Sequence, residues 1–169
     1  MTLNVTAITH EDTHRLVESI LDKIVRDDMD DVAKAKAVFD YVRQKIHYTA
    51  VANYSEPHIE TYFGLKYGRG DCYAYAIASE FLLAKAGIDN RMLTRVGGTT
   101  RHYWNLVNIG GEWFHFDTCP NRDGSNERRF LFDEPTAKEL AELSAYRLTN
   151  YYTYDHSLHP RVVGCDECN

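Results

Sequence analysis

Three residues, Cys72, His102 and Asp117, have the types and the spacing of a thiol acyl-transfer site. Cys72 follows Gly68-Arg69-Gly70-Asp71 and begins a stretch rich in alanine and leucine that we expect to be a helix. Free N–H groups and the macrodipole at a helix N-terminus favour a thiolate over a thiol, and the Cys72 N–H points to where an oxyanion would form. This pattern nominates Cys72 as a nucleophile, and alone it leaves a small, unreactive buried cysteine equally open.

His102 and Asp117 lie on either side of Gly110-Gly111, which is a typical hairpin turn. If the two glycines form a two-residue turn, Asp117 pairs with Trp104 and lies diagonal to His102 on the same face of the ribbon. Diagonal partners are roughly 7 to 8 Å apart between backbones, so the carboxylate can reach the imidazole. We therefore predict that Asp117 orients His102, and that His102 exchanges a proton with the Cys72 sulfur as general base and acid.

The elements that would position these residues follow from the spacing of apolar side chains. Intervals of three and four residues predict helices at 9–25, 32–45, 72–86 and 136–148, the first and last beginning with Thr9-x-x-Asp12 and Thr136-x-x-Glu139. The helix from Cys72 is the most apolar and therefore central, with Gly87 as its expected C-terminal cap. Strands are predicted at 91–96, 102–109 and 112–117. Residues 48–70 show no clean period and are interpreted as an irregular surface connection.

The bulk properties fit one globular domain, with a core at about 32–120 and an irregular tail at 149–169. The net charge is −6 and the 19 Lys and Arg residues are scattered, which disfavours nucleic acid as a partner. No apolar run approaches the roughly 18 residues of a membrane span. The N-terminus lacks a signal-peptide pattern, so we expect a soluble chain. Its compartment and oligomeric state stay open, and a fragment of an exported or surface protein is one option.

Several motifs resemble, in order and approximate spacing, the core motifs of the transglutaminase-like superfamily. They are Gly70-Asp71-Cys72 with Ala76, Gly87-Ile88 followed by Arg91, His102-x-Trp104-Asn105 and Trp113-x-x-x-Asp117, preceded by a segment from Phe39 to Ile46-x-Tyr48. The resemblance spans about 32–120, and the separations also suit the family's compact bacterial members. It implies a papain-like α+β core in which the cysteine helix packs against an antiparallel sheet that carries His and Asp.

The resemblance further implies that the thiolate attacks an amide carbonyl to give a thioester. Water would resolve this intermediate by proteolysis or deamidation, and an amine would resolve it by cross-linking. We favour a hydrolytic, protease-like enzyme acting on peptides or proteins, without a cofactor. The alternatives are a transglutaminase that transfers an amine to protein glutamine, and a peptide-binding module that keeps the fold without catalysis.

Four aromatic residues are secondary candidates for this site. Tyr48 is nearest to the position from which the family often supplies a second oxyanion donor, although a tyrosine that merely packs on the central helix is the favoured alternative. Trp104, Tyr73 and Tyr67 are candidates for the substrate cleft, because aromatic rings suit a half-wet groove that grips polypeptide. Large aromatic residues in strands are more often part of the core.

The tail contains His156-x-x-His159 and Cys165-x-x-Cys168, the residue types that a tetrahedral zinc ion would take. The gap between the two pairs is shorter than in usual zinc modules, and a single Cys-x-x-Cys is a weak signal. A metal site, a disulfide or redox pair, and a frayed tail all remain open. We assign no metal and favour the frayed tail.

Overall fold

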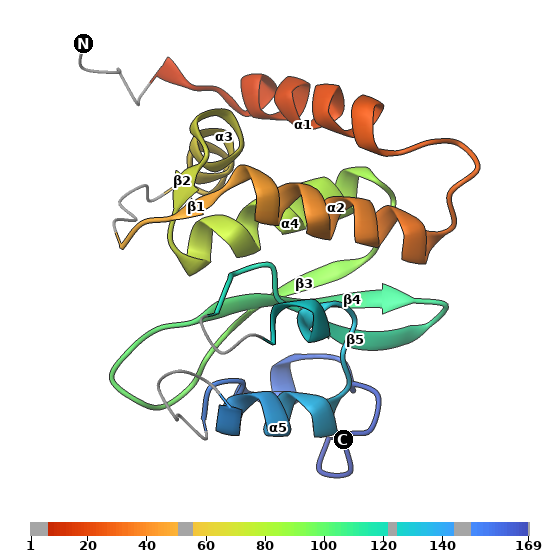
Figure 1. Cartoon of the computed structure of the whole chain (residues 1–169), viewed down its shortest axis with the longest axis vertical. Helices are drawn as coiled ribbons and strands as arrows, with labels where there is room; N and C mark the ends of the chain where they lie inside the picture. The colour runs from red at the N-terminus through yellow and green to blue at the C-terminus, as the bar shows by residue number, and fades with distance from the viewer. Residues whose placement is uncertain (1–6, 51–55, 122–124, 144–149, 169) are drawn as a thin grey trace.

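The computed structural model describes residues 7–50, 56–121, 125–143 and 150–168, and arranges helices on both sides of a small sheet (Figure 1). Helices α1–α4 lie on one side, and α5 with the C-terminal segment lies on the other. The elements in chain order are α1 (His10–Ile24), α2 (Asp31–Lys45), β1 (His47–Tyr48), α3 (Pro57–Tyr67), β2 (Arg69–Gly70), α4 (Cys72–Lys85), β3 (Asn90–Thr94), β4 (Tyr103–Ile109), β5 (Glu112–Phe116), the 3-10 helix η2 (Asn126–Arg129), α5 (Glu134–Leu143) and the 3-10 helix η3 (His156–Leu158).

The first two helices confirm the sequence-based boundaries to within a residue or two. Thr9 and Asp12 form the predicted capping box at the start of α1, each side chain accepting the other's backbone N–H. Asp30 caps α2 through the Ala33 N–H. Each helix buries one apolar face, and these faces help to form the core around α4.

Helix α4 is the central element, as its composition predicts. Most of its side chains are buried, from Cys72 to Leu83. The helix stops where Gly87 adopts a left-handed conformation with φ of 84°, and the N–H of Ile88 returns to the carbonyl of Leu83. Neither α4 nor any other helix within the described ranges is long and apolar enough to cross a membrane.

The sheet has the order β3-β4-β5, and both pairings are antiparallel. Gly110 and Gly111 both have positive φ, 63° and 93°, which a tight turn of the primed type requires. The resulting register pairs Leu106 with His115 and Asn105 with Phe116. The predicted two-residue hairpin is therefore confirmed.

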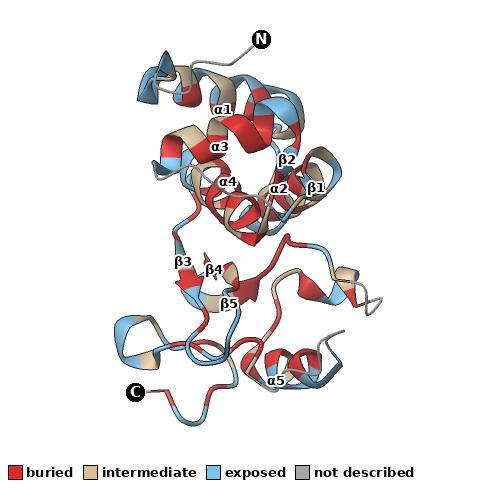
Figure 2. Ribbon diagram, turned by 90° about the vertical axis from the view of Figure 1, so that its left-hand side faces the viewer, coloured by how far each residue is buried: buried red, intermediate tan, exposed pale blue. Residues whose placement is uncertain are grey.

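The two faces of the sheet pack into two different hydrophobic cores (Figure 2). Along β4, Val107 packs toward the helical layer, and Asn105 on the same face donates a hydrogen bond to the Ala76 carbonyl of α4 at 3.1 Å. Trp104 and Leu106 face the second core with α5 and the C-terminal segment. This alternation follows from the period of two in a strand and decides which residues can meet on each face.

The prediction for residues 48–70 is wrong, because this region contains α3 flanked by the short parallel strands β1 and β2. Pro57 occupies the first turn of α3, and Gly68 ends the helix with φ of 71°. The helix buries side chains on several sides, including Thr61, Phe63 and Leu65. No single apolar stripe results, and the amphipathic period that reveals other helices is missing.

The C-terminal part also differs from expectation. Helix α5 begins at Glu134, and the carboxylate of Asp133, rather than Thr136, caps it by accepting the Thr136 N–H at 2.9 Å. The predicted continuation from 144 to 148 lies outside the described residues. The tail is irregular apart from η3, but it is not frayed, because its aromatic residues and both cysteines are buried in the molecule.

Gly70 gives a direct test of how closely β2 approaches the nucleophile helix. A Cβ atom at Gly70 would lie 2.1 Å from the Ala74 Cβ, much closer than two non-bonded carbon atoms can approach. We expect Gly70→Ala to lower the free energy of unfolding in urea by about 1–3 kcal/mol through overpacking.

The double variant Gly70→Ala/Ala74→Gly removes the clashing methyl group and should recover part of that loss. A Gly70→Ala variant as stable as the wild type would contradict the packing described for β2 and α4.

Candidate active site

His102 and Asp117 form a buried pair at the edge of the sheet. His102 immediately precedes β4 and Asp117 immediately follows β5. The His102 Nε2 lies 2.9 Å from the Asp117 Oδ2, and the two residues are 4% and 0% exposed. The pairing that the hairpin parity predicts is therefore confirmed as a contact, whereas the catalytic roles of the two residues stay predictions.

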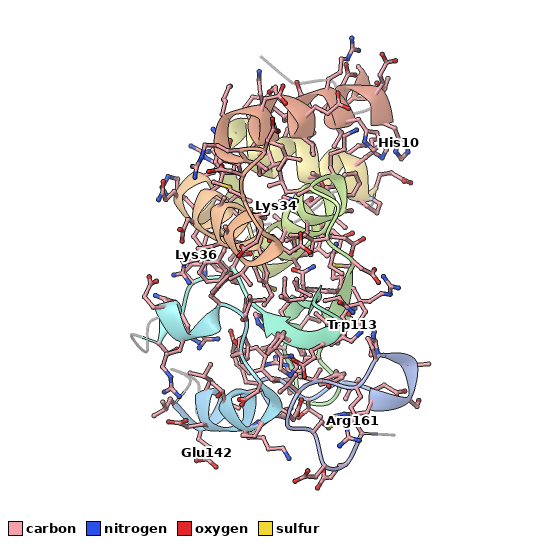
Figure 3. The ribbon with its side chains drawn as sticks, turned by 90° about the vertical axis from the view of Figure 1, so that its right-hand side faces the viewer. His10, Lys34, Lys36, Trp113, Glu142 and Arg161 are labelled. Carbon is pink, nitrogen blue, oxygen red and sulfur yellow. A yellow bond between two sulfur atoms is a disulfide. The ribbon has the colours of Figure 1, made fainter. Side chains whose placement is uncertain are left out.

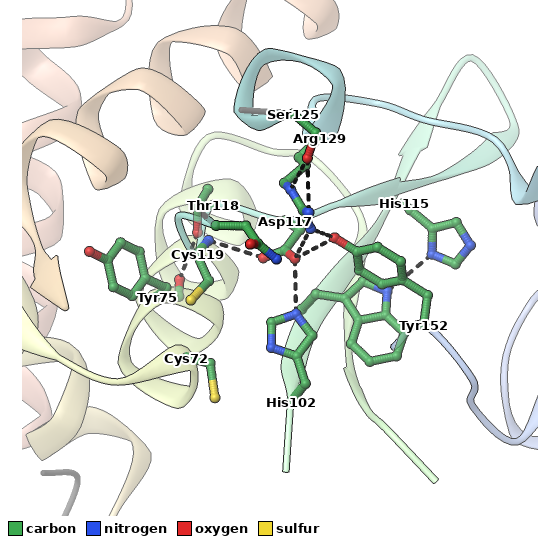
Figure 4. A network of polar contacts seen from close by, with 12 residues as sticks. Cys72, Tyr75, His102, His115, Asp117, Thr118, Cys119, Ser125, Arg129 and Tyr152 are labelled. Atoms are coloured by element: carbon green, nitrogen blue, oxygen red, sulfur yellow. Dashed lines mark hydrogen bonds and ion pairs between the residues drawn. The ribbon is translucent and has the colours of Figure 1, made fainter. Parts of the chain in front are cut away.

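The Asp117 carboxylate accepts hydrogen bonds from four groups (Figure 4). Besides His102, the Tyr152 hydroxyl donates to Oδ2 at 2.7 Å, Arg129 Nη1 lies 3.4 Å from Oδ2, and the Cys119 N–H donates to Oδ1 at 3.0 Å. Burial alone would raise the pKa of Asp117, but His102, Arg129 and Tyr152 outweigh it and the pKa is lowered. The carboxylate is thus ionised and fixed in orientation.

Aromatic rings hold the His102 imidazole in place. Trp104 lies nearly parallel to it, with ring centroids 5.6 Å apart and 15° between planes, and Tyr151 packs at 4.4 Å. Because Nε2 is bonded to Asp117, Nδ1 is the nitrogen left for proton transfer, and Figure 4 shows the ring between Asp117 and Cys72.

Cys72 is the first residue of α4, and its sulfur lies against the backbone on both sides of His102. The Sγ is 3.9 Å from the Arg101 carbonyl oxygen, and the N–H groups of Tyr103 and Tyr73 stabilise its anionic form. The residue is 8% exposed. The start of α4 and the segment that leads into β4 therefore meet at the thiol, one residue on either side of His102.

The charge around Cys72 differs from the sequence-based expectation. Burial and then the negative charge of Asp71 raise the pKa of the Cys72 thiol to about 11. Asp71 is the N-cap of α4 and accepts the N–H groups of Tyr73 and Ala74, so an acid occupies the positive end of the helix. The helix terminus therefore does not favour a thiolate at Cys72, contrary to the prediction from the sequence.

Tyr48 and Tyr73, two of the secondary candidates, lie close in the fold to the nucleophile. Tyr48 pairs with Gly70 in the β1–β2 ladder, two residues before Cys72, and it is 54% exposed. The ring of Tyr73 packs edge-to-face on Tyr103 at 5.1 Å, next to the residues that contact the thiol. An oxyanion role for Tyr48 and a cleft role for Tyr73 stay predictions.

The other two aromatic candidates do not line an open cleft beside Cys72. Trp104 is only 1% exposed, stacks on His102 and donates a hydrogen bond to His115 at 3.0 Å, so it supports the base from the core instead of forming an open cleft wall. Tyr67, at the end of α3, packs on Phe63 of the same helix with centroids 5.0 Å apart. The proposed cleft role of Trp104 is therefore corrected, and that of Tyr67 has no support from its contacts.

Three residues of the site were not predicted from the sequence: Arg129, Tyr151 and Tyr152. Arg129, the last residue of η2, is fully buried, and its side chain also donates hydrogen bonds to the Ser125 and Tyr152 hydroxyls. The run of tyrosines at 151–154 was the available signal, because rings so closely spaced are more typical of packed structure than of a solvated tail.

Three of the four residues of the tail motif lie close together. His156, Cys165 and Cys168 present ligand atoms that all lie within 4.8 Å of one another, and the two cysteines are joined as a disulfide. His159 is not in this group and packs on the ring of Tyr154 at 5.9 Å.

Comparisons with known proteins agree with this architecture. The family model of the transglutaminase-like superfamily matches residues 18–118, more than half of the chain. A crystal structure of a "putative cysteine protease" from Cytophaga hutchinsonii has a TM-score of 0.52 at 16% identity over 69% of this chain and 45% of that one. A crystal structure of a TGase gives 0.47 at 16% identity over 69% and 34%. The curated proteins yield no significant match.

The chain therefore spans less than half the length of these two structures. At 16% identity, the likeness to the first of them concerns the fold alone. The α+β, papain-like core predicted from the motifs is confirmed at that level.

The raised pKa of Cys72 predicts an unusual pH profile for alkylation. Only the thiolate reacts, and a pKa raised to about 11 leaves little thiolate at neutral pH. Iodoacetamide labelling of Cys72, followed by peptide mass spectrometry, should therefore increase with pH well beyond the midpoint of about 8.5 for a free cysteine.

Asp71→Asn keeps a side chain that can cap the helix and removes the negative charge, so it should shift this profile to lower pH. A wild-type midpoint below that of free cysteine would contradict the assigned balance of charges.

Tyr152 should stabilise the protein through Asp117. Tyr152→Phe removes a buried hydrogen bond to a carboxylate, and we expect a loss of about 1.5–3 kcal/mol in the free energy of unfolding. Tyr151→Phe is the matched control, because it removes a neighbouring hydroxyl and keeps the ring on His102. Equal losses in the two variants, measured by urea denaturation, would contradict the special role of the Tyr152 hydroxyl.

Proposed function

The chain belongs to the transglutaminase-like superfamily, and from this premise we propose that it is a cysteine-dependent enzyme that hydrolyses amide bonds of peptides or proteins. Cys72 is the nucleophile, His102 is the general base and acid, and Asp117 orients His102. The bond between His102 Nε2 and Asp117 Oδ2 supports this best, because it leaves Nδ1 for the thiol at the N-terminus of α4.

The first step forms a thioester. As the Cys72 sulfur attacks the substrate carbonyl carbon, its proton passes to His102 Nδ1 and the carbonyl oxygen becomes an oxyanion. The Cys72 N–H, which the Asp71 cap does not take, is the first donor to that oxyanion, and the Tyr48 hydroxyl is the candidate second donor. When the oxyanion collapses, the C–N bond breaks and His102 returns the proton to the leaving amine.

The buried Asp117 supports both halves of this step. An ionised carboxylate on Nε2 stabilises the imidazolium that forms when Nδ1 takes the proton. Because the resting Cys72 is a thiol with a raised pKa, the proton transfer is part of the attack and not a prior equilibrium. The imidazole cannot rotate away, since Trp104 and Tyr151 pack against it.

The second step releases the acyl group. His102 accepts a proton from the incoming nucleophile, which forms a bond to the thioester carbon; when the C–S bond breaks, His102 returns that proton to the leaving Cys72 sulfur. Hydrolysis needs only water, whereas amine transfer needs a second subsite that orients the amine. We therefore propose hydrolysis as the main outcome, and transamidation is the alternative that the same acyl-enzyme permits.

Incubation with casein separates these outcomes. We expect new peptide termini by mass spectrometry, and a loss of at least about a thousandfold in cleavage rate for Cys72→Ala and His102→Ala. His14→Ala is the matched control for the histidine substitution, since His14 is exposed on α1 and should leave the rate unchanged.

The same incubation with a fluorescent primary amine tests the transfer reaction. Incorporation of the amine into casein without new termini would replace hydrolysis by transamidation. Neither product, combined with binding of casein, would overturn the enzyme assignment in favour of a peptide-binding module.

A further inference from the structure

Three side chains with metal-binding chemistry converge in the C-terminal segment, away from the proposed catalytic residues. The Nδ1 of His156 lies 2.6 Å from the Cys168 Sγ and 3.6 Å from the Cys165 Sγ. Both cysteines are buried, and His156 is half-buried. Two thiolates and one imidazole nitrogen are a ligand set that suits Zn²⁺, which prefers soft and borderline donors.

We propose that the reduced form of this segment binds one zinc ion through His156 Nδ1, Cys165 Sγ and Cys168 Sγ, with water in the fourth position. The proposal departs from the sequence-based expectation of no metal, and it narrows the four residues of the tail motif to three. His159 is left out because its ring packs on Tyr154 and its nitrogens do not join the cluster.

The imidazole is oriented for this role. The ring of His156 stacks on Tyr154 with centroids 4.2 Å apart and 24° between planes. Tyr154 is itself fixed, because it is buried and its hydroxyl donates to Glu134 at 3.3 Å. A ring held in this way presents Nδ1 to the sulfurs without further ordering, which lowers the entropic cost of binding an ion.

The loop that carries the cysteines is also held by the body of the molecule. Val163 donates its N–H to the Trp113 carbonyl of β5 at 3.0 Å, and the Glu134 N–H at the start of α5 donates to the Val163 carbonyl at 2.9 Å. Figure 3 shows Arg161 of this segment on the same side of the molecule as Trp113. The histidine and the loop with the two cysteines are therefore both held in place without a bound ion.

The position of His156 distinguishes zinc binding from a simple disulfide. Cys165 and Cys168 are disulfide-bonded in the structure. The sulfurs of a disulfide carry no charge and are weak hydrogen-bond acceptors. The His156 Nδ1 nevertheless lies closer to the Cys168 Sγ than a hydrogen bond to sulfur requires. As co-ligands of one ion, at about 2.0–2.3 Å from it, the nitrogen and both sulfurs each have a defined role.

A dithiol can reduce the Cys165–Cys168 disulfide to the form that binds zinc. Two electrons and two protons from the reductant convert the Cys165–Cys168 disulfide into two thiols, and the reductant becomes a disulfide. Zinc binding then releases the two thiol protons and gives a site with two thiolates and one neutral imidazole.

Such a site would act on the proposed catalytic residues through the chain. The segment that ends in the cysteines begins with Tyr151 and Tyr152, which contact His102 and Asp117. Binding energy at the cysteines becomes folding energy of this segment. Zinc would therefore help to hold the two tyrosines against the His102–Asp117 pair.

Metal analysis of the whole chain tests the proposal. We expect protein purified in a phosphine reductant, supplied with Zn²⁺ and then desalted, to retain about one zinc per chain by elemental mass spectrometry. His156→Ala and Cys165→Ser should lose it, and His159→Ala, the matched control, should keep it. Chelation should lower the Tm of the wild type but not that of Cys165→Ser.

Thiol titration of the same samples makes a negative result decisive. Reduced Cys165 and Cys168 without bound zinc would overturn the site, as would a disulfide that survives the reductant. Equal zinc in His156→Ala and wild type would also overturn it, and loss of zinc in His159→Ala would overturn the assigned ligand set. These readouts do not depend on amide hydrolysis, so they stand or fall separately from the proposed function.

Discussion

A buried carboxylate, that of Asp117, holds together the sheet, η2 and the C-terminal segment. Asp117 has no exposed surface, and an ionised group in that position is tolerated only if donors surround it. Its donors come from the start of β4, from η2 and from the C-terminal segment, as His102, Arg129 and Tyr152. Three segments that are distant in sequence therefore pack together around Asp117, and they cover the edge of the sheet there.

The start of α4 shows a compromise between helix stability and thiol reactivity. Asp71 is a strong N-cap that accepts two backbone N–H groups, which a stable central helix requires. The same carboxylate opposes the negative charge of a thiolate on the next residue. In the proposed mechanism, activation of Cys72 therefore depends on the His102–Asp117 pair more than on the dipole of α4.

Features set by neighbouring residues could be predicted from the sequence, and features set by distant contacts could not. The glycine turn and the period of two in the strands were enough to place His102 beside Asp117, and the capping box located α1. Helix α3 was missed because it is buried on several sides and has no stripe. Arg129 carries no local signal, since only the folded chain brings it to Asp117.

The length of the Gly110-Gly111 turn determines which face of the sheet carries Asp117, and therefore whether Asp117 can reach His102. Adding or removing a single residue between His102 and Asp117 would turn the carboxylate toward the helical layer and bring Phe116 or Thr118 to its place. Insertions that preserve the pair must come in twos or form a bulge that restores the alternation. The hairpin should therefore tolerate changes of residue type at its exposed positions better than a change of its length by one residue.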